Sequence, residues 1–574
     1  MTRLLRQFLA GITIVLAAGC GGSSSPEKKP EGGPVRGGSL VASLRSEPGT
    51  FNRFAPGTGN SGATDVVTRL TQATLVRVNH ATGETEPWLA ERWTTSPDGR
   101  TLTFTLRDGV TFSDGAPFTS ADVVFTFRAL YDPTVESVLA SAVQVEGKPL
   151  EVSAPDPRTV TVTLPAPFTN APALLDSVWI FPQHQLQKAL DAHAFAKAWG
   201  LSTPPGSMAG LGPFVLSEFA PGERMTFTRN PRYWRKDTSG APLPYLDRLV
   251  VEFAKSQDAE VTRLEAGTID LMSQADLRAN DISTARKMRD QGTVQLVDVG
   301  VSLDPNLLWF NLTPAADARD RQTKPYLHRV EFRQAISYAV DRDAIIKTIY
   351  LGAAAPIYGP ISPSNRTWYS DAAPKYPHDA ARATALLAAI GLSDRNGDGM
   401  LEDAAGKPVG FSIIAQAGHT REKVATLIQE QLKQVGIAVD VVPLDPPSLG
   451  GRFAKGEYET IYHGFQTSAL DPALTLDFWL SSGSGHVWNP EQKTPGTPWE
   501  RQIDDLMRQQ AAAPTLVERQ RLFGEVQKIF GENLPAIYFV APNVTIALSR
   551  RVGGAVPGVL DPKILWQADT LYAR

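Results

Sequence analysis

Short stretches of the chain alternate apolar and polar residues with a period of two. Residues 101–106 (TLTFTL) place leucine and phenylalanine on one side and threonine on the other, and residues 160–164 (VTVTL) repeat the arrangement. This period predicts half-buried β-strands. Between them, residues 119–122 (TSAD) have the spacing of a helix N-cap with a carboxylate that reaches back to it, so we expect a helix over residues 123–130.

Longer stretches predict strands that are connected through helices. Two strand–helix–strand units follow from the pattern, one over residues 249–253, 258–266 and 269–272 and one over residues 411–415, 424–435 and 437–441. Gly267 and Gly436 stand where each helix should end. Strands joined in this way lie parallel in one sheet. Because strands and helices interleave along the whole chain, we predict an α/β fold.

A further region predicts two consecutive helices. Within residues 331–350, the apolar side chains at 332, 335, 336, 339 and 340 form one helical face. Asp341 interrupts this face and can cap a second, shorter helix that runs to residue 350. Together these patterns predict two α/β lobes, with a mainly β region at about residues 75–205 inserted in the first.

Residues 1–20 differ from the rest of the chain. Two arginines precede an apolar run over residues 8–18, which is too short to span a membrane and has the proportions of a signal peptide. Residues 17–20 (AAGC) resemble the bacterial lipobox and end in Cys20, the single cysteine, and residues 21–34 are polar and predict a flexible tether. We therefore predict a lipid on Cys20 and a protein held in the periplasm or at the outer face of the cytoplasmic membrane. The alternatives are that the cysteine stands at this position by chance and that residues 21–34 are an unstructured leader that does not serve as a tether.

Composition narrows the classes of function. Of the 574 residues, 42% are apolar and 20% charged, which fits a protein with a large core, and the net charge of -4 with no basic stripe makes nucleic acid an unsuitable partner. The 8 histidines are scattered, with no His-Glu-x-x-His pattern, so we predict no zinc site. The chain contains neither a Gly-x-Ser-x-Gly elbow nor a phosphate-binding loop. We therefore expect no enzyme and no cofactor.

Six short motifs lie one after another between residues 86 and 342. They are residues 86–93 (EPWLAERW), 96–107 (SPDGRTLTFTLR), 112–123 (FSDGAPFTSADV), 212–214 (GPF), 229–234 (RNPRYW) and 332–342 (FRQAISYAVDR). In order and spacing the chain resembles the family 5 extracellular solute-binding proteins, which are the dipeptide-, oligopeptide- and nickel-type receptors of ABC importers. The resemblance implies a two-lobed, type II periplasmic-binding-protein fold with an extra domain inserted in lobe one.

The resemblance also implies how the chain divides and what it does. The expected parts are a signal peptide over residues 1–20, a tether over 21–37, a first lobe over 38–74, 209–303 and 542–574, its inserted subdomain over 75–208, and a second lobe over 304–541. The lobes would close about a hinge on a peptide-like solute, and a monomer would deliver it to ABC permease subunits in the membrane. A receptor for an oligosaccharide or other non-peptide solute, and a sensor or chaperone without a permease, are the alternatives.

The ligand-contacting residues follow partly from the family. Peptide-type members hold the ligand's α-amino group with a carboxylate that lies four residues before the proline of an acidic-Pro motif. Here Asp471 and Pro472 match the motif, but the anchor position is Ser468, which cannot neutralise an ammonium group. Asp471 would replace it if the loop is shifted. The predicted pocket residues are Phe465, Ser468, Asp471 and Trp488 from the second lobe and Thr58 and Asn60 from the first.

One acidic loop resembles the start of a calcium-binding loop. Asp394, Asn396 and Asp398 supply oxygen ligands at the first, third and fifth positions. The twelfth position is Ala405 instead of glutamate, so an acidic residue at 402–403 would have to complete the site. The alternative is a polar turn before the next strand.

Overall fold

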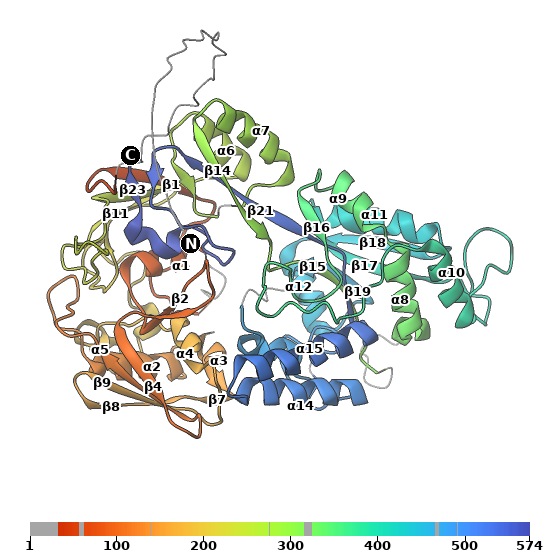
Figure 1. Ribbon diagram of the computed structural model, residues 1–574, viewed down its shortest axis with the longest axis horizontal. Helices are drawn as coiled ribbons and strands as arrows, with labels where there is room; N and C mark the ends of the chain where they lie inside the picture. Colours follow the sequence, from red (N-terminus) through yellow and green to blue (C-terminus); the bar gives the residue numbers. More distant parts are fainter. Residues whose placement is uncertain are drawn as a thin grey trace, which may run out of the picture.

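Three large β-sheets organise the chain in two lobes. The computed structural model describes residues 33–56, 62–137, 139–274, 276–314, 324–418, 420–464, 470–490 and 492–574. Figure 1 shows the first lobe, with the red to yellow part of the chain, on the left and the second lobe, with the cyan part, on the right. Among the helices of these described residues, none combines the length and apolar character that crossing a membrane requires.

An eight-stranded sheet forms the body of the first lobe. Its strands, in spatial order, are β10 (Phe214–Ala220), β11 (Arg224–Arg229), β12 (Arg248–Phe253), β1 (Ser39–Leu44), β13 (Leu271–Met272), β21 (Val540–Ser549) and β14 (Val294–Val301), with β16 (Ala354–Pro356) added to β21. Strands β12, β1 and β13 run parallel. Helices α6 (Gln257–Glu265) and α7 (Ala279–Asp290) pack on one face, and α1 (Gly62–Thr71) belongs to the larger core on the other.

The inserted part of the first lobe has its own antiparallel sheet. The strands are β4 (Ala90–Thr95), β5 (Thr101–Leu106), β9 (Thr159–Thr163) and β8 (Glu151–Asp156), in that order. Helices α2 (Ser120–Tyr131), α4 (Ala171–Leu174) and α5 (Gln183–Asp191) accompany it, with the hairpins β2 (Val76–Val78)–β3 (Thr85–Pro87) and β6 (Gln144–Val145)–β7 (Lys148–Pro149). Its apolar residues join the main core of the first lobe, so the two sheets share one hydrophobic interior.

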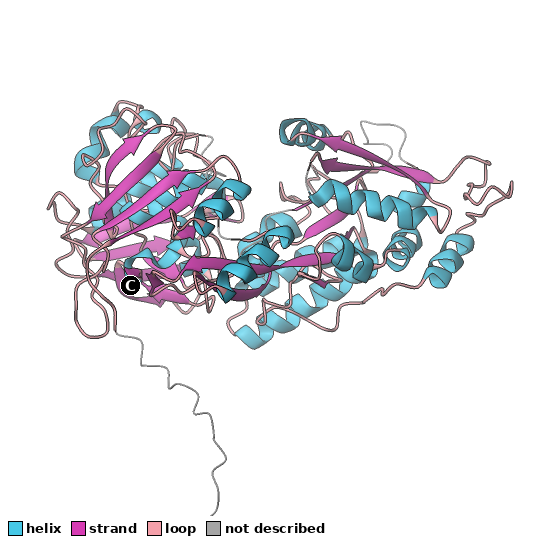
Figure 2. Cartoon of the chain, turned by 90° about the horizontal axis from the view of Figure 1, so that it is seen from above, coloured by secondary structure: helices cyan, strands magenta, loops and turns pink. Residues whose placement is uncertain are grey.

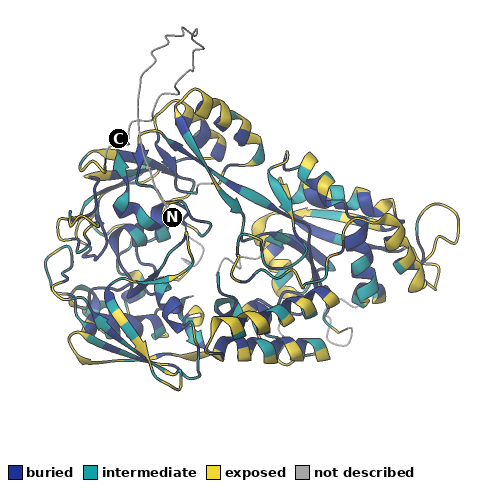
Figure 3. Ribbon diagram, in the orientation of Figure 1, coloured by how far each residue is buried: buried dark blue, intermediate teal, exposed yellow. Residues whose placement is uncertain are grey.

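A five-stranded sheet with helices on both faces forms the second lobe. The order is β18 (Ala438–Leu444), β17 (Gly410–Gln416), β19 (Thr460–Gly464), β15 (Asn306–Phe310) and β20 (Ala536–Tyr538). The helices are α8 (Val330–Ala339), α9 (Arg342–Thr348), α10 (Ala380–Ala389), α11 (Thr420–Lys433), α12 (Pro446–Lys455), α13 (Leu476–Trp479), α14 (Pro498–Ala512) and α15 (Leu516–Asn533). Leu308 and Phe310 enter one core, while Leu307 and Trp309 enter the other, because alternate side chains of a strand face opposite sides. Figure 3 shows the resulting burial along these strands.

Two passes of the chain connect the lobes. One leads from β14 to β15, and the other from β20 to β21. Strand β21 belongs to both lobes, since residues 543–549 pair with β14 and residues 540–542 pair with β16. It appears as the long strand between the lobes in Figures 1 and 2. A paired strand that continues from one lobe into the other provides the kind of connection about which such lobes hinge.

Most elements predicted from the sequence are confirmed. The two threonine-rich strands are β5 and β9, and Thr119 caps α2 in a capping box with Asp122. The later strand–helix–strand unit is β17–α11–β18, with neighbouring parallel strands. In the earlier unit, β12 and β13 are parallel but are separated by β1, and β13 covers only residues 271–272. Periodicity identifies strands, whereas the order of strands depends on distant segments such as β1.

Candidate functional site

A cleft with a volume of about 1320 Å³ lies between the two lobes. The first lobe contributes the β2–β3 hairpin, the segment after α4, strand β14 and residues 557–561. The second lobe contributes residues 363–368, residues 470–471 and nearby apolar side chains. Sites for small molecules usually measure about 300–1,000 Å³, so this cleft has room for an oligomeric ligand.

The lobes also touch opposite the hinge strands. The backbone NH of Thr169 donates to the carbonyl oxygen of Ala511 at 2.9 Å, and its hydroxyl donates to that of Ala513 at 2.8 Å. The Asn170 amide donates to Asp471 Oδ2 at 2.9 Å. Because these bonds join the inserted part of the first lobe to the second lobe, protein bounds the cleft at both ends.

Asp471 lines the cleft as predicted, but its carboxylate is already bound within the protein. Its Oδ1 accepts from Arg519 Nη2 at 2.6 Å and from the Ala473 backbone NH at 2.9 Å, and its Oδ2 accepts from Asn170. Both Arg519 and Asp471 are buried. The charge of Asp471 is therefore neutralised by Arg519, which corrects the expectation that Asp471 replaces the missing ammonium anchor at Ser468.

Trp488 lies in the interior of the second lobe instead of the cleft. Its side chain is 0% exposed, its ring packs edge-on to Phe478 and Phe530, and its indole NH donates to Glu500 Oε1 at 3.3 Å. The prediction that Trp488 contacts ligand is corrected by this burial. An aromatic side chain in a core and one in a pocket give the same signal in a sequence.

The remaining predicted contact residues fall outside the part of the chain that the structure describes. These are Thr58, Asn60, Phe465 and Ser468, and Cys20 lies outside it as well. Their proposed roles stay predictions.

Asp176 in the first-lobe wall is a cleft residue that the sequence analysis did not single out. It sits in the short 3₁₀ helix Leu175–Ser177 that follows α4. Its Oδ1 is buried without a hydrogen-bond partner, and within the described residues the carboxylate forms no ion pair. Burial raises the pKa of Asp176 to about 6, although the positive charge of Arg69 and the backbone NH of Val78 work in the opposite direction.

The charged neighbours of Asp176 have partners of their own. Arg69 Nε donates to Asp65 Oδ2 at 2.7 Å, and Arg77 Nη2 donates to Glu86 Oε2 at 2.8 Å. Burial, assisted by Arg69, lowers the pKa of His80 to about 3, so His80 is neutral at physiological pH. Asp176 is thus a carboxylate in the cleft wall without a dedicated counter-ion.

A signal for Asp176 was present in the sequence. Residues 171–181 (APALLDSVWIF) are apolar except for this aspartate and one serine. A single charge in an apolar run must be paired in the fold or face a functional cavity.

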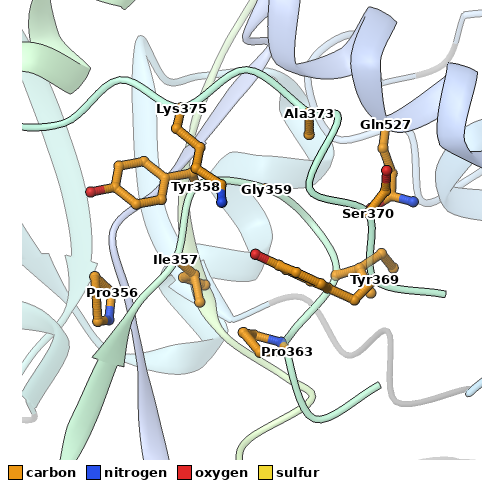
Figure 4. Close-up of a pocket in the computed structure, with 11 residues that line it drawn as sticks. Pro356, Ile357, Tyr358, Gly359, Pro363, Tyr369, Ser370, Ala373, Lys375 and Gln527 are labelled. Atoms are coloured by element: carbon orange, nitrogen blue, oxygen red, sulfur yellow. The ribbon is translucent and has the colours of Figure 1, made fainter. Parts of the chain in front are cut away.

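A smaller cavity of about 120 Å³ lies within the second lobe. Its polar lining includes Tyr358, Tyr369, Lys375 and Gln527, which Figure 4 shows around it. Lys375 is paired with Asp371 at 2.7 Å, and Gln527 donates to the Trp368 carbonyl at 2.9 Å. Since these groups are engaged and the volume is small, the interlobe cleft is the better candidate for a ligand site.

The predicted calcium loop is an exposed turn. Carboxylate oxygens of Asp394, Asp398 and Glu402 lie within 4.8 Å of one another, and the amide of Asn396 donates to Asp398 Oδ2 at 3.1 Å. The two carboxylate oxygens of Asp394 accept the backbone NH groups of Gly397 and Gly399, as in a polar turn. The loop satisfies its own oxygens, so calcium binding stays a prediction.

Comparison with known proteins identifies the family of the chain. The model for bacterial extracellular solute-binding proteins, family 5 (middle region), matches residues 84–486. The chain belongs to this family. A probable ABC transporter-binding protein of Deinococcus radiodurans is 27% identical over 507 residues, which cover 84% of each chain. The oligopeptide-binding protein AppA of Bacillus subtilis is 24% identical over 576 residues, which cover 96% of each.

Solved structures of similar proteins have the same fold. AppA of Bacillus subtilis in complex with a nonapeptide matches with a TM-score of 0.71 and 23% sequence identity, over 94% of this chain and 100% of AppA. The binding protein MelB of Agrobacterium fabrum in complex with stachyose matches with a TM-score of 0.75 and 22% identity, over 95% of this chain and 86% of MelB. The predicted two-lobed type II fold is therefore confirmed.

Family membership shows the broad role of the protein. This family 5 protein is an extracytoplasmic substrate-binding protein of an ABC importer, which binds a solute and works with a permease. It is a receptor and not an enzyme, as the sequence analysis predicted. The geometry fits this role, because two lobes joined by continuous strands can enclose a ligand without acting on it chemically.

Proposed function

We propose that this receptor captures a peptide-like solute in the interlobe cleft and delivers it to its permease. The observation that carries the proposal is the size of the cleft together with walls that come from both lobes. Closure of the lobes on the solute would exclude water and give the permease a closed form to recognise.

The relatives of this chain support a peptide-like solute, but one protein of the same fold binds an oligosaccharide. AppA binds oligopeptides and is similar to this chain over nearly its whole length. MelB, which has the same fold, was solved with the oligosaccharide stachyose. Ser468, at the position where peptide receptors carry an acid, favours a non-peptide solute as the second candidate.

Native mass spectrometry of the protein purified without added ligand tests the proposal. We expect a monomer that carries a heterogeneous set of peptide masses, which denaturation releases. One discrete oligosaccharide mass would instead establish the second candidate. Refolding the denatured protein without ligand and adding a peptide digest provides the control, because a peptide receptor should regain the same distribution of bound masses.

We also propose that a lipid on Cys20 anchors the receptor at the outer face of the cytoplasmic membrane. A thiol-linked lipid with additional acyl chains holds a protein firmly at a bilayer, whereas one chain alone gives reversible binding. We expect the full chain to partition into detergent and its Cys20→Ser variant to remain in the aqueous phase. Equal partitioning of both proteins would contradict the proposal, and Ser24→Ala serves as a control in the same segment.

A further inference from the structure

The walls of the cleft carry an excess of negative charge. Among the described residues, five carboxylates line it but only two guanidinium groups, those of Arg69 and Arg366. The carboxylates belong to Glu84, Asp176, Asp298, Asp471 and Asp561. A concave surface with low-dielectric walls focuses such a charge and favours a solute of opposite sign.

Most of these carboxylates are engaged or exposed to water. Asp471 is paired with Arg519, and Asp561 is paired with Lys563 at 2.8 Å. Asp298 is exposed and accepts the backbone NH of Gly300. Asp176 differs, because one of its oxygens is buried and unpartnered and its charge has no ion-pair partner among the described residues.

A second, much smaller recess that Asp176 also lines has no room for a ligand group. Asp176, Gln72 and Arg77 line this recess, whose volume is about 30 Å³. It has room for about one water molecule. A larger group must reach the carboxylate from the cleft side, which Asp176 also lines.

We propose that Asp176 holds a cationic nitrogen of the bound solute, from the lobe opposite to the loop that carries Ser468. The inference rests on the proposed function and specifies its ligand as an amine-bearing peptide-like solute. A carboxylate with one buried, unpartnered oxygen is costly, and an ammonium group that enters during closure would satisfy that oxygen. The free amino terminus of a peptide or a basic side chain supplies such a group.

The charges that face Asp176 do not remove this preference. Arg69 and Arg77 are the nearest cations. Arg69 pairs with Asp65 at 2.7 Å, a carboxylate that Arg53 also approaches at 4.0 Å, and Arg77 pairs with Glu86 at 2.8 Å. His80 is neutral at physiological pH, and Asp561, which lies near Arg69, adds negative charge. An incoming ammonium group therefore meets an attractive site.

The test compares free and fully acetylated peptides on two proteins. A tryptic peptide digest, with and without acetylation of its amines, is offered to the ligand-stripped receptor and to its Asp176→Asn variant. The affinity of the best-captured peptide that contains no arginine, in which acetylation neutralises the amino terminus and every lysine, is then measured in both forms by calorimetry. We expect the wild type to bind the free form at least about 30-fold more tightly, Asp176→Asn to lose about 30-fold for the free form, and both proteins to bind the acetylated form alike.

Acidity gives a second readout. The affinity of the wild type for the free peptide should fall as the pH drops below about 6, where Asp176 takes up a proton, while that of Asp176→Asn should change little. The ligand-free variant should melt at or above the wild-type temperature, because it lacks an unpartnered buried charge. Asp191→Asn, the same change on the exposed end of α5, should keep wild-type affinity.

The outcomes separate this inference from the proposed function. If free peptides bind and Asp176→Asn binds them within threefold of the wild type, or acetylation has no effect, the inference is overturned and the peptide receptor remains. If no peptide binds, the solute found by mass spectrometry decides between the remaining outcomes. A solute without a cationic nitrogen overturns both the peptide receptor and the role of Asp176. A non-peptide amine that Asp176→Asn binds more weakly overturns the peptide receptor but supports the role of Asp176.

Discussion

Replacing Arg519 with methionine is expected to destabilise the second lobe by about 3–5 kcal/mol, because the change leaves Asp471 buried without its counter-ion. Arg519 is 5% exposed, and its Nη2 lies 2.6 Å from Asp471 Oδ1. Its Nε also donates to the Gln510 carbonyl, and its guanidinium stacks on the Trp368 ring at 5.0 Å. A fall of roughly 10 °C in the melting temperature of the ligand-free protein would be the result.

The same helix offers a matched control. Arg521 lies two residues further along α15, is exposed, and pairs with Glu518 at 2.8 Å. Arg521→Met should change stability by less than about 0.5 kcal/mol, as expected of a surface ion pair. If Arg519→Met melts like Arg521→Met, the interpretation of Asp471 as a structural carboxylate is wrong. Asp471 would then be free to contact ligand, as the sequence analysis expected.

Replacing Arg342 with methionine is expected to have a comparable effect, of about 3–5 kcal/mol, since it removes several hydrogen bonds from one buried side chain. Arg342 is 4% exposed. Its guanidinium donates to the backbone carbonyls of Ile357, Ser337, Tyr376 and Tyr538 and to the Ser337 hydroxyl, at 2.9–3.3 Å. Burial lowers the pKa of Arg342 to about 10, so the group remains charged at neutral pH.

Two further variants make this prediction specific. Arg342→Lys keeps the charge but cannot reach carbonyls in several directions, so it should restore less than half of the lost stability. Arg329→Met removes an exposed guanidinium at the start of α8 and should be nearly neutral. The measurement is the melting temperature of each ligand-free protein. A wild-type melting temperature for Arg342→Met would show that other groups or water satisfy these carbonyls.

The role of Arg342 explains why the motif at residues 332–342 identified the family and not the ligand. Arg333 in the same motif is also buried, and it donates to the carbonyls of Leu327, Asn533 and Leu534. Both arginines use their planar donors to join backbone segments that are far apart in the chain. A motif built on such contacts reports the architecture of the second lobe.

The sequence alone determined the local elements and the family. The alternation in residues 101–106, the capping box at Thr119 and the βαβ pattern over residues 411–441 all depend on neighbours within a few positions, and each appears in the structure as expected. The ordered motifs added the two-lobed fold, which a single pattern could not supply.

Only the tertiary structure decided which polar and aromatic side chains face the cleft. Asp471 meets Arg519 across 48 positions and Asn170 across 301, so no local pattern shows that its charge is neutralised. Trp488 is covered by helices that approach from elsewhere in the chain. Among the described residues Asp176 forms no ion pair, because the nearby cations Arg69 and Arg77 pair with Asp65 and Glu86. Secondary structure follows from short-range periodicity, whereas the pairing of a buried charge depends on every segment that folds against it.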